Sequence, residues 1–142
     1  MCRVETFYKV VILTESFVIR EKLPSLNDTI AKNRANRYVG AKYKAEIEST
    51  ICYYIKDAVA KGLIHKRDKP CYIAIEWSER TKRRDADNIQ SSQKFILDSL
   101  VKCGILKDDS RKYVKNVVHT IVDGKTDSVK VTIADSAEII IS

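Results

Sequence analysis

The segment RTKRRDADN, residues 80–88, carries the side chains best suited to chemistry. Four cations precede two carboxylates, Asp85 and Asp87, that are spaced two residues apart. In an extended segment, side chains at this spacing point to the same side, so the two carboxylates converge as the chain enters the predicted helix that follows. Converging carboxylates repel one another unless a proton or a cation separates them. The pattern therefore suits a hard divalent ion such as Mg²⁺, which prefers carboxylate oxygens.

A second acidic pair, Asp108 and Asp109, follows the same predicted helix. A helix of about 15 residues is roughly 22 Å long. The five residues before Asp109 span at most about 17 Å when fully extended. Asp109 can therefore meet Asp85 and Asp87 only if the helix starts late or the site lies part-way along it.

Each pattern also has an ordinary structural interpretation. Asp87 is a good helix N-cap, and Gln90 three residues later completes a capping-box-like pattern. Residues 108–110 are typical of a turn, and the run from 82 to 84 could be a solvated loop. Cations suited to phosphate beside carboxylates suited to metal favour a metal-dependent enzyme acting on nucleic acid. The residues alone leave both interpretations open.

Histidine, cysteine and tyrosine residues give weaker evidence for a functional site. His65 and His119 are isolated, and no serine or cysteine lies in a recognisable nucleophile motif, so a histidine-based triad has little support. The four cysteines are far apart, which favours free thiols over a zinc site or a disulfide framework. Tyr38 and Tyr43 could stack on bases, although packing is the commoner role of tyrosine.

The composition is that of a globular protein and predicts a single domain over residues 1–142. Hydrophobic residues make up 44% and charged residues 32%, and the formal net charge is +7. Residues 1–84 hold 18 Lys and Arg against 10 Asp and Glu, whereas the remainder is nearly balanced. A basic front half predicts a polyanionic partner. No apolar run approaches the roughly 18–20 residues needed to span a bilayer, so we expect an intracellular protein.

Hydrophobic periodicity predicts a small α/β (α+β) fold, a mixed sheet with two main helices packed on one face. The helices are expected over residues 41–61 and 88–103, each ended by a glycine. Strands are expected over residues 4–13, 17–19, 71–77, 113–122 and 128–133, with the last two forming a hairpin. We expect a turn at 14–16, a polar loop at 24–40, and a last strand or dimer contact at 139–141.

Three segments, RDADNIQ (84–90), KFILDSL (94–100) and GILKDD (104–109), together resemble the RusA family of Holliday-junction resolvases. The family pattern is roughly Arg-Asp-x-Asp-Asn, a helix ending Leu-Asp-Ala-Leu, a glycine and a paired Asp-Asp. Upstream, residues 23–27 resemble the family's Pro-Ser-x-Asn stretch. The resemblance covers about residues 17–133 and is most specific in the acidic blocks.

This resemblance implies a small homodimeric endonuclease that cuts four-way DNA junctions with Mg²⁺, for which Mn²⁺ can substitute. It implies that Asp85, Asp87 and Asp109 bind the metal, with a lesser role for Asp108. It also implies that Arg84, and by extension Lys82 and Arg83, meet the DNA backbone.

One departure from the family concerns its essential lysine, which lies four residues after the second aspartate. Here that position is Ser91, and the nearest lysine is Lys94, as if residues 91–93 were inserted. Positions four and seven residues on share a helix face, so Lys94 stays on the side of Asp87, about one turn further along. We expect Lys94 to take the catalytic role of stabilising negative charge in phosphodiester hydrolysis.

The leading hypothesis is a Mg²⁺-dependent endodeoxyribonuclease that resolves Holliday junctions by paired symmetric nicks, in recombination and repair. Lys32, Arg34 and Arg37 are expected to follow backbone phosphates together with the 82–84 run. The expected setting is the cytoplasm of a bacterium, or a phage or prophage. The alternatives are a nucleic-acid-binding module without catalysis and a Mg²⁺-dependent nuclease for other branched DNA.

Overall fold

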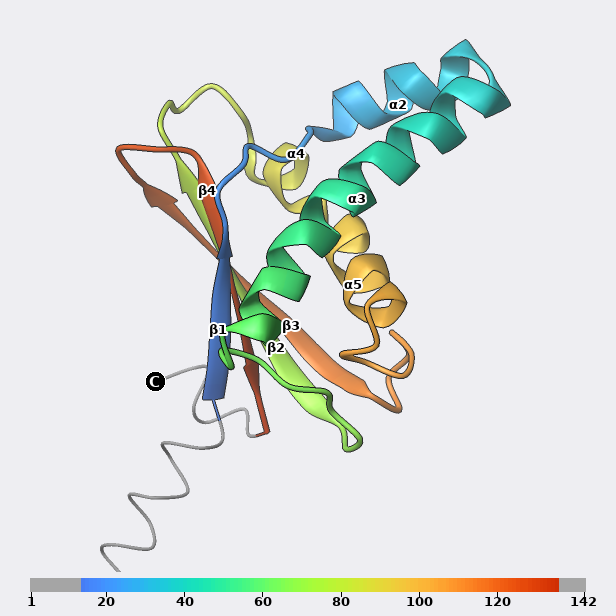
Figure 1. The fold of residues 1–142 in the computed structure, drawn as a ribbon. Helices are drawn as coiled ribbons and strands as arrows, with labels where there is room; N and C mark the ends of the chain where they lie inside the picture. The colour runs from blue at the N-terminus through green and yellow to red at the C-terminus, as the bar shows by residue number, and fades with distance from the viewer. Residues whose placement is uncertain (1–13, 136–142) are drawn as a thin grey trace, which may run out of the picture.

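The computed structural model describes residues 14–135, and it shows helices covering one face of a four-stranded mixed sheet (Figure 1). The strand order is β1-β4-β2-β3, and only β2 and β3 run parallel. This arrangement confirms the predicted fold class. The strands are β1 (Thr14–Ile19), β2 (Cys71–Glu79), β3 (Val114–Asp123) and β4 (Ser128–Ala134).

Strand β2 forms the centre of the core because every second side chain faces the helices. Ile73, Ile75 and Trp77 are each at most 1% exposed, while Glu76 on the opposite face is exposed. The β-branched, apolar sequence predicts this strand well. The structure extends it by two residues to Glu79, whose carboxylate matters for the site below.

Helix α3 (Arg37–Ala60) is the longest element and starts four residues before the predicted position. Its C-terminal half packs on the sheet, with Ile51 and Ile55 fully buried. Gly62 ends it as expected: its φ is +72°, and the Leu63 amide donates to the Ala58 carbonyl at 2.9 Å.

The expected polar loop over residues 24–40 is wrong, because it contains helix α2 (Leu26–Ala35) and the start of α3. Helix α2 buries none of its residues, so no apolar periodicity marks it in the sequence. Local capping defines it instead, through reciprocal hydrogen bonds between Ser25 and Asp28. We call α2 and the first half of α3, residues 26–47, the α2–α3 arm; it projects beyond the sheet (Figure 1).

The second predicted helix is interrupted at residues 91 and 92, which separate α4 (Ala86–Gln90) from α5 (Gln93–Lys102). The interruption falls within the apparent three-residue insertion. The Ser92 hydroxyl donates to the Pro24 carbonyl at 2.6 Å and ties this break to the segment before α2. The predicted stop at Gly104 is confirmed, since its φ is +80° and the Ile105 amide donates to the Leu100 carbonyl at 2.9 Å.

The expected β3–β4 hairpin is wrong, because β2 lies between the two strands. The 123–127 turn passes over the end of β2, where the Gly124 amide donates to the Glu79 carbonyl at 3.0 Å. The Ser78 hydroxyl also donates to the Thr126 carbonyl at 3.0 Å. Alternation in β3 and β4 predicts strands but does not reveal their partner.

The expected turn at residues 14–16 is wrong as well, because these residues begin β1 and pair with β4. The strand expected over residues 4–13 and the apolar run at 139–141 lie outside the described residues. None of the helices between residues 14 and 135 is long and apolar enough to cross a membrane.

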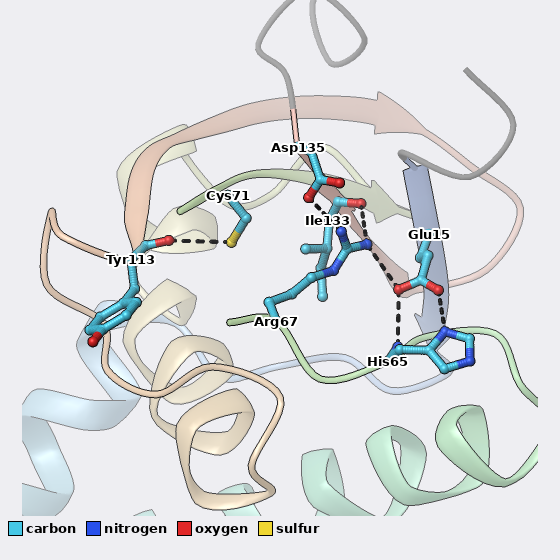
Figure 2. A network of polar contacts seen from close by, with 7 residues as sticks. All are labelled: Glu15, His65, Arg67, Cys71, Tyr113, Ile133 and Asp135. Carbon is cyan, nitrogen blue, oxygen red and sulfur yellow. Dashed lines mark hydrogen bonds and ion pairs between the residues drawn. The ribbon is translucent and has the colours of Figure 1, made fainter. Parts of the chain in front are cut away.

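A polar network ties the α3–β2 connector to the edge of the sheet (Figure 2). Arg67 donates to Glu15 of β1 at 2.8 Å and to Asp135, just after β4, at 2.6 Å. Glu15 also accepts from the backbone amide of His65 at 3.0 Å and lies against the His65 ring. Arg67 and His65 of this basic connector therefore serve the fold.

Candidate active site

The basic run before the two aspartates is anchored by Arg84. Its guanidinium donates to both Glu79 oxygens, at 2.9 and 2.8 Å, and to the Leu23 carbonyl at 2.8 Å. The Arg84 and Glu79 side chains are only 14% and 8% exposed. A bidentate pair of this kind fixes geometry as well as charge. Arg84 therefore joins the end of β2 to the segment before α2 and holds the loop that leads to Asp85.

Asp85 and Asp87 lie at the start of α4 and are both exposed. Asp85 occupies the N-cap position, although its side chain makes no capping hydrogen bond. Asp87, expected as the N-cap, lies in the first helical turn and accepts from the Asn88 amide at 3.0 Å. Within residues 14–135 neither carboxylate forms an ion pair, although cations precede them. Two carboxylates left without a cation are a suitable donor pair for a hard divalent ion.

Lys94 brings α5 and the second acidic pair together. Its ammonium donates to Asp109 at 2.8 Å and lies 3.1 Å from Asp98, one helical turn along α5. These carboxylates, Asp109 first, raise the pKa of Lys94, and the Lys94 ammonium lowers the pKa of Asp109. Both shifts hold the pair in its charged form. The lysine and the third aspartate singled out from the sequence are therefore in direct contact.

A partly buried hydrogen-bond chain reaches the start of α5, directly before Lys94. The Trp77 indole donates to Nδ1 of His119 at 2.9 Å, and Nε2 of His119 lies 2.6 Å from Oε1 of the Gln93 side chain. Because an indole nitrogen only donates, Nδ1 must accept, and the proton of neutral His119 lies on Nε2. Burial lowers the pKa of His119, which agrees with this neutral state.

The Lys94–Asp109 pair opens onto a hollow of about 550 Å³ between α3, α5 and the 107–109 segment, which we call the Lys94 hollow. Its charges are compensated. Lys44 of α3 lies 3.4 Å from Asp98 and 3.7 Å from the largely buried Glu48, and Lys102 lies 3.9 Å from Glu48. Cations and carboxylates thus alternate across this surface.

The structure does not gather the three predicted metal ligands into one site. Within residues 14–135, no set of three or more Asp, Glu, His or Cys side chains is placed to hold a metal ion. Asp109 contacts Lys94, whereas Asp85 and Asp87 lie at α4. Asp108 accepts from the Ser110 amide at 2.7 Å, as a turn residue does.

The other predicted DNA-binding residues are exposed. Lys82 lies 3.6 Å from Asp123 of β3, and Arg83 is exposed without an ion pair to any described residue. Lys32, Arg34 and Arg37 lie on the α2–α3 arm, remote in sequence from the 82–84 run. The predicted phosphate contacts thus divide between the β2–α4 loop and the arm.

A comparison with protein families shows to which family the chain belongs. The model of the family described as Endodeoxyribonuclease RusA matches residues 9–134. The chain belongs to the RusA family. Membership implies endodeoxyribonuclease activity on Holliday junctions, a form of branched DNA. A comparison with curated proteins gives no match, so the assignment rests on the family model and on the motifs above.

Sequence reasoning missed the residues that support this RusA site. Asp98 lies in the helix motif, but no role was predicted for it. Its spacing of four residues from Lys94 is a signal for an ion pair on one helix face. Glu79 is the residue that Arg84 contacts, and it lies in a strand that continues past Trp77. His119 and Gln93 meet across 26 positions, and no local pattern marks such a pair.

Proposed function

We propose that this RusA-family chain is a Mg²⁺-dependent, homodimeric endonuclease that resolves four-way junctions by paired symmetric nicks, in recombination and repair in a bacterium or phage. The observation that supports this proposal best is the contact between Lys94 and Asp109. It joins the two motif blocks despite the three-residue insertion, which the break between α4 and α5 accommodates.

Asp85 and Asp87 are the residues that would hold the metal, with Mn²⁺ able to replace Mg²⁺. Asp109, the third predicted ligand, contacts Lys94 in the structure and would join them only when the metal is bound. When bound, such an ion acts as a Lewis acid that polarises a phosphoryl oxygen and acidifies bound water. Asp85 and Asp87 suit it because both carboxylates are exposed and unpaired with a described cation.

The remaining groups have roles that follow from their contacts. Lys94, kept protonated by Asp109 and Asp98, supplies positive charge where negative charge develops on phosphate or on the leaving oxygen. Arg84 positions the loop bearing Asp85, because Glu79 and Leu23 engage three of its five N–H donors and its side chain is only 14% exposed. Lys82 and Arg83 remain the loop cations for backbone phosphates. A two-fold dimer presents two such sites to the two like-polarity strands of a junction.

The decisive experiment is cleavage of an end-labelled synthetic four-way junction, with and without Mg²⁺ or Mn²⁺, beside a matched linear duplex and a flap. We expect metal-dependent, symmetric nicks confined to the junction. Asp87→Asn should bind the junction without cutting it, because the metal-binding charge is lost while the cations remain. Asp57→Asn is the matched control, since Asp57 pairs with Lys61 on α3 and should leave cleavage unchanged.

Tight junction binding with no product in either metal would contradict the nuclease proposal and favour a binding module without catalysis. Equal cutting of flaps and junctions would instead favour a nuclease for branched DNA in general. Sedimentation of the protein alone tests the dimer, for which a monomer at working concentration is the contradicting result.

A further inference from the structure

The tip of the α2–α3 arm carries a cluster of basic side chains. Residues 32–42 contain Lys32, Arg34, Arg37 and Lys42 and no Asp or Glu. All four cations are exposed, and none forms an ion pair within residues 14–135. Nearby Lys44, by contrast, faces two carboxylates. A cluster of cations without ion-pair partners attracts a polyanion.

The two helices of the arm are joined by local contacts, although α2 buries none of its residues. Asn36 is the single residue between the helices, and its side chain caps α3 by accepting from the Val39 amide at 2.8 Å. Gly40 allows the helices to cross closely, because a Cβ there would lie 2.6 Å from the Asn33 side-chain oxygen. The cap and the close crossing together define the turn between the two helices at the tip of the arm.

Tyr38 lies among these cations and is 75% exposed, more than any other large hydrophobic side chain in the described residues. The Tyr38 side chain has no hydrogen bond and no aromatic partner between residues 14 and 135. Other tyrosines of α3 do have partners: Tyr43 packs edge-on against Phe95 at 6.5 Å, and Tyr53 packs on Tyr54 at 5.3 Å. An aromatic face left open beside phosphate-binding cations is the arrangement used to stack on nucleic-acid bases.

A hollow of about 320 Å³ adjoins the ring, and its lining suits a nucleotide. Tyr38 and Tyr43 supply ring surfaces, and Lys32 and Lys42 supply cations. Lys32 lies 5.9 Å from the centre of the Tyr43 ring. Glu46 supplies an acceptor for an exocyclic amino group, as carboxylates do for cytosine.

We propose that the tip of the α2–α3 arm is a second DNA-binding site, in which Tyr38 stacks on an unpaired base while the surrounding cations hold its backbone. This inference deepens the proposed junction nuclease, since the branch point of a junction is where bases can leave the duplex stack. It assigns to the arm recognition of unstacked bases, in addition to attraction of phosphate.

The test measures affinity in EDTA, where no cleavage occurs, for a labelled single-stranded 15-mer, the matched duplex and a four-way junction. Stacking on one base is worth about 1–3 kcal/mol, so Tyr38→Ala should weaken single-strand and junction binding by about tenfold. Binding to the duplex should stay within about twofold of wild type, because its bases remain paired. Tyr38→Phe should bind as wild type does, because it keeps the ring.

The matched control is Tyr53→Ala, which removes another exposed tyrosine of α3, at 66% exposure, outside the arm. It should bind all three DNAs as wild type does. A second measurement needs no variant: 2-aminopurine in the single strand should lose fluorescence when wild-type protein is added, because stacking on an aromatic ring quenches it.

Unchanged affinity of Tyr38→Ala, equal losses on duplex and single strand, or an unchanged 2-aminopurine signal would each overturn the inference. Its failure is distinct from failure of the nuclease proposal. Metal-dependent junction cleavage with wild-type DNA binding by Tyr38→Ala refutes the arm site alone. Loss of single-strand binding by Tyr38→Ala in a protein that never cuts refutes the nuclease proposal and leaves the arm site standing.

Discussion

The Lys94 hollow and the tip of the α2–α3 arm both carry several basic side chains, but these form ion pairs in the hollow and none at the tip. In the hollow, Lys44, Lys94 and Lys102 each lie within 4.0 Å of a carboxylate. On the arm, none of the four cations at the tip has such a partner among residues 14–135. Pairing commits a cation to a position, whereas an unpaired cation is available to a phosphate. The paired cations of the hollow are therefore suited to positioning catalytic groups, and the unpaired cations of the arm are suited to binding DNA.

Arg84 provides the largest expected effect, because it is a paired cation in a sequence run that looks like a phosphate-binding loop. Removing one partner of a buried ion pair costs about 3–5 kcal/mol, since the other charge stays buried and unpaired. Arg84→Ala should lower the free energy of unfolding by about this amount, measured in urea. Arg83→Ala, at an exposed neighbour, should change it by less than about 0.5 kcal/mol. Equal stability of the two variants would contradict the structural role of Arg84.

Lys94, a paired cation of the hollow, is expected to affect the rate of cleavage more than the affinity for DNA. Loss of a group that stabilises developing charge typically lowers kcat by about 10²–10³. Lys94→Gln should show such a loss in single-turnover cleavage while junction affinity changes little, because this cation is engaged with Asp109. A large loss of affinity with normal cleavage at saturating protein would place Lys94 with the arm cations instead.

The arm cations should affect affinity and its salt dependence. Each phosphate contact contributes about one unit to the slope of log affinity against log salt. The triple variant Lys32→Gln, Arg34→Gln, Arg37→Gln should flatten this slope by up to about three units on junction DNA. Lys44→Gln together with Lys102→Gln is the matched control from the hollow. An equal flattening in the control would remove the distinction between paired and unpaired cations.

His119, which contacts Gln93 next to Lys94, predicts that the stability of the protein depends on pH. Burial lowers its pKa below the ordinary value of 6.5, so the unfolded chain takes up a proton before the folded chain does. The contribution of His119 is therefore complete above about pH 6.5 and is lost as the pH falls through the folded pKa. Protonation would also turn Nδ1 into a donor facing the Trp77 indole. His119→Phe should flatten the pH dependence of the melting temperature in this range.

Lys44 gives the smallest expected effect. Exposed ion pairs typically contribute about 0.2–1 kcal/mol, and Lys44 is 54% exposed. Lys44→Met should change the free energy of unfolding by no more than this. The combination with Lys102→Met should cost more than the two single changes together, because Glu48 then has neither of its two lysine partners. Strict additivity would show that Glu48 does not depend on them.

What the sequence predicts correctly depends on whether a pattern is local. The alternation over residues 71–77 and the apolar face of α3 predict β2 and most of α3, and Gly62 and Gly104 predict two helix ends. Helix α2 escapes detection because nothing in it is buried. The order of the strands escapes because alternation in β3 and β4 carries no information about what lies between them.

The candidate site follows the same division. The motif resemblance singled out Lys94 and Asp109, and the structure brings them into contact across 15 positions. The anchoring of Arg84 by Glu79 and the chain from Trp77 to Gln93 were not predicted. These contacts depend on side chains that tertiary packing alone brings together, whereas charge runs in the sequence show only that cations are present.

The position of β4 has a consequence for how the chain folds. Because β4 lies between β1 and β2, Thr14 pairs with Ala134, and the edges of β1 and β2 that face β4 have no hydrogen-bond partners until β4 is in place. During synthesis the helices can form while the sheet remains open, and closure of the sheet joins β1 to β4, which are distant in sequence. Such long-range closure slows folding and leaves strand edges exposed to other molecules for longer. We therefore expect the sheet to be completed only after β4 leaves the ribosome, and truncation before residue 128 to yield an aggregating chain rather than a smaller stable domain.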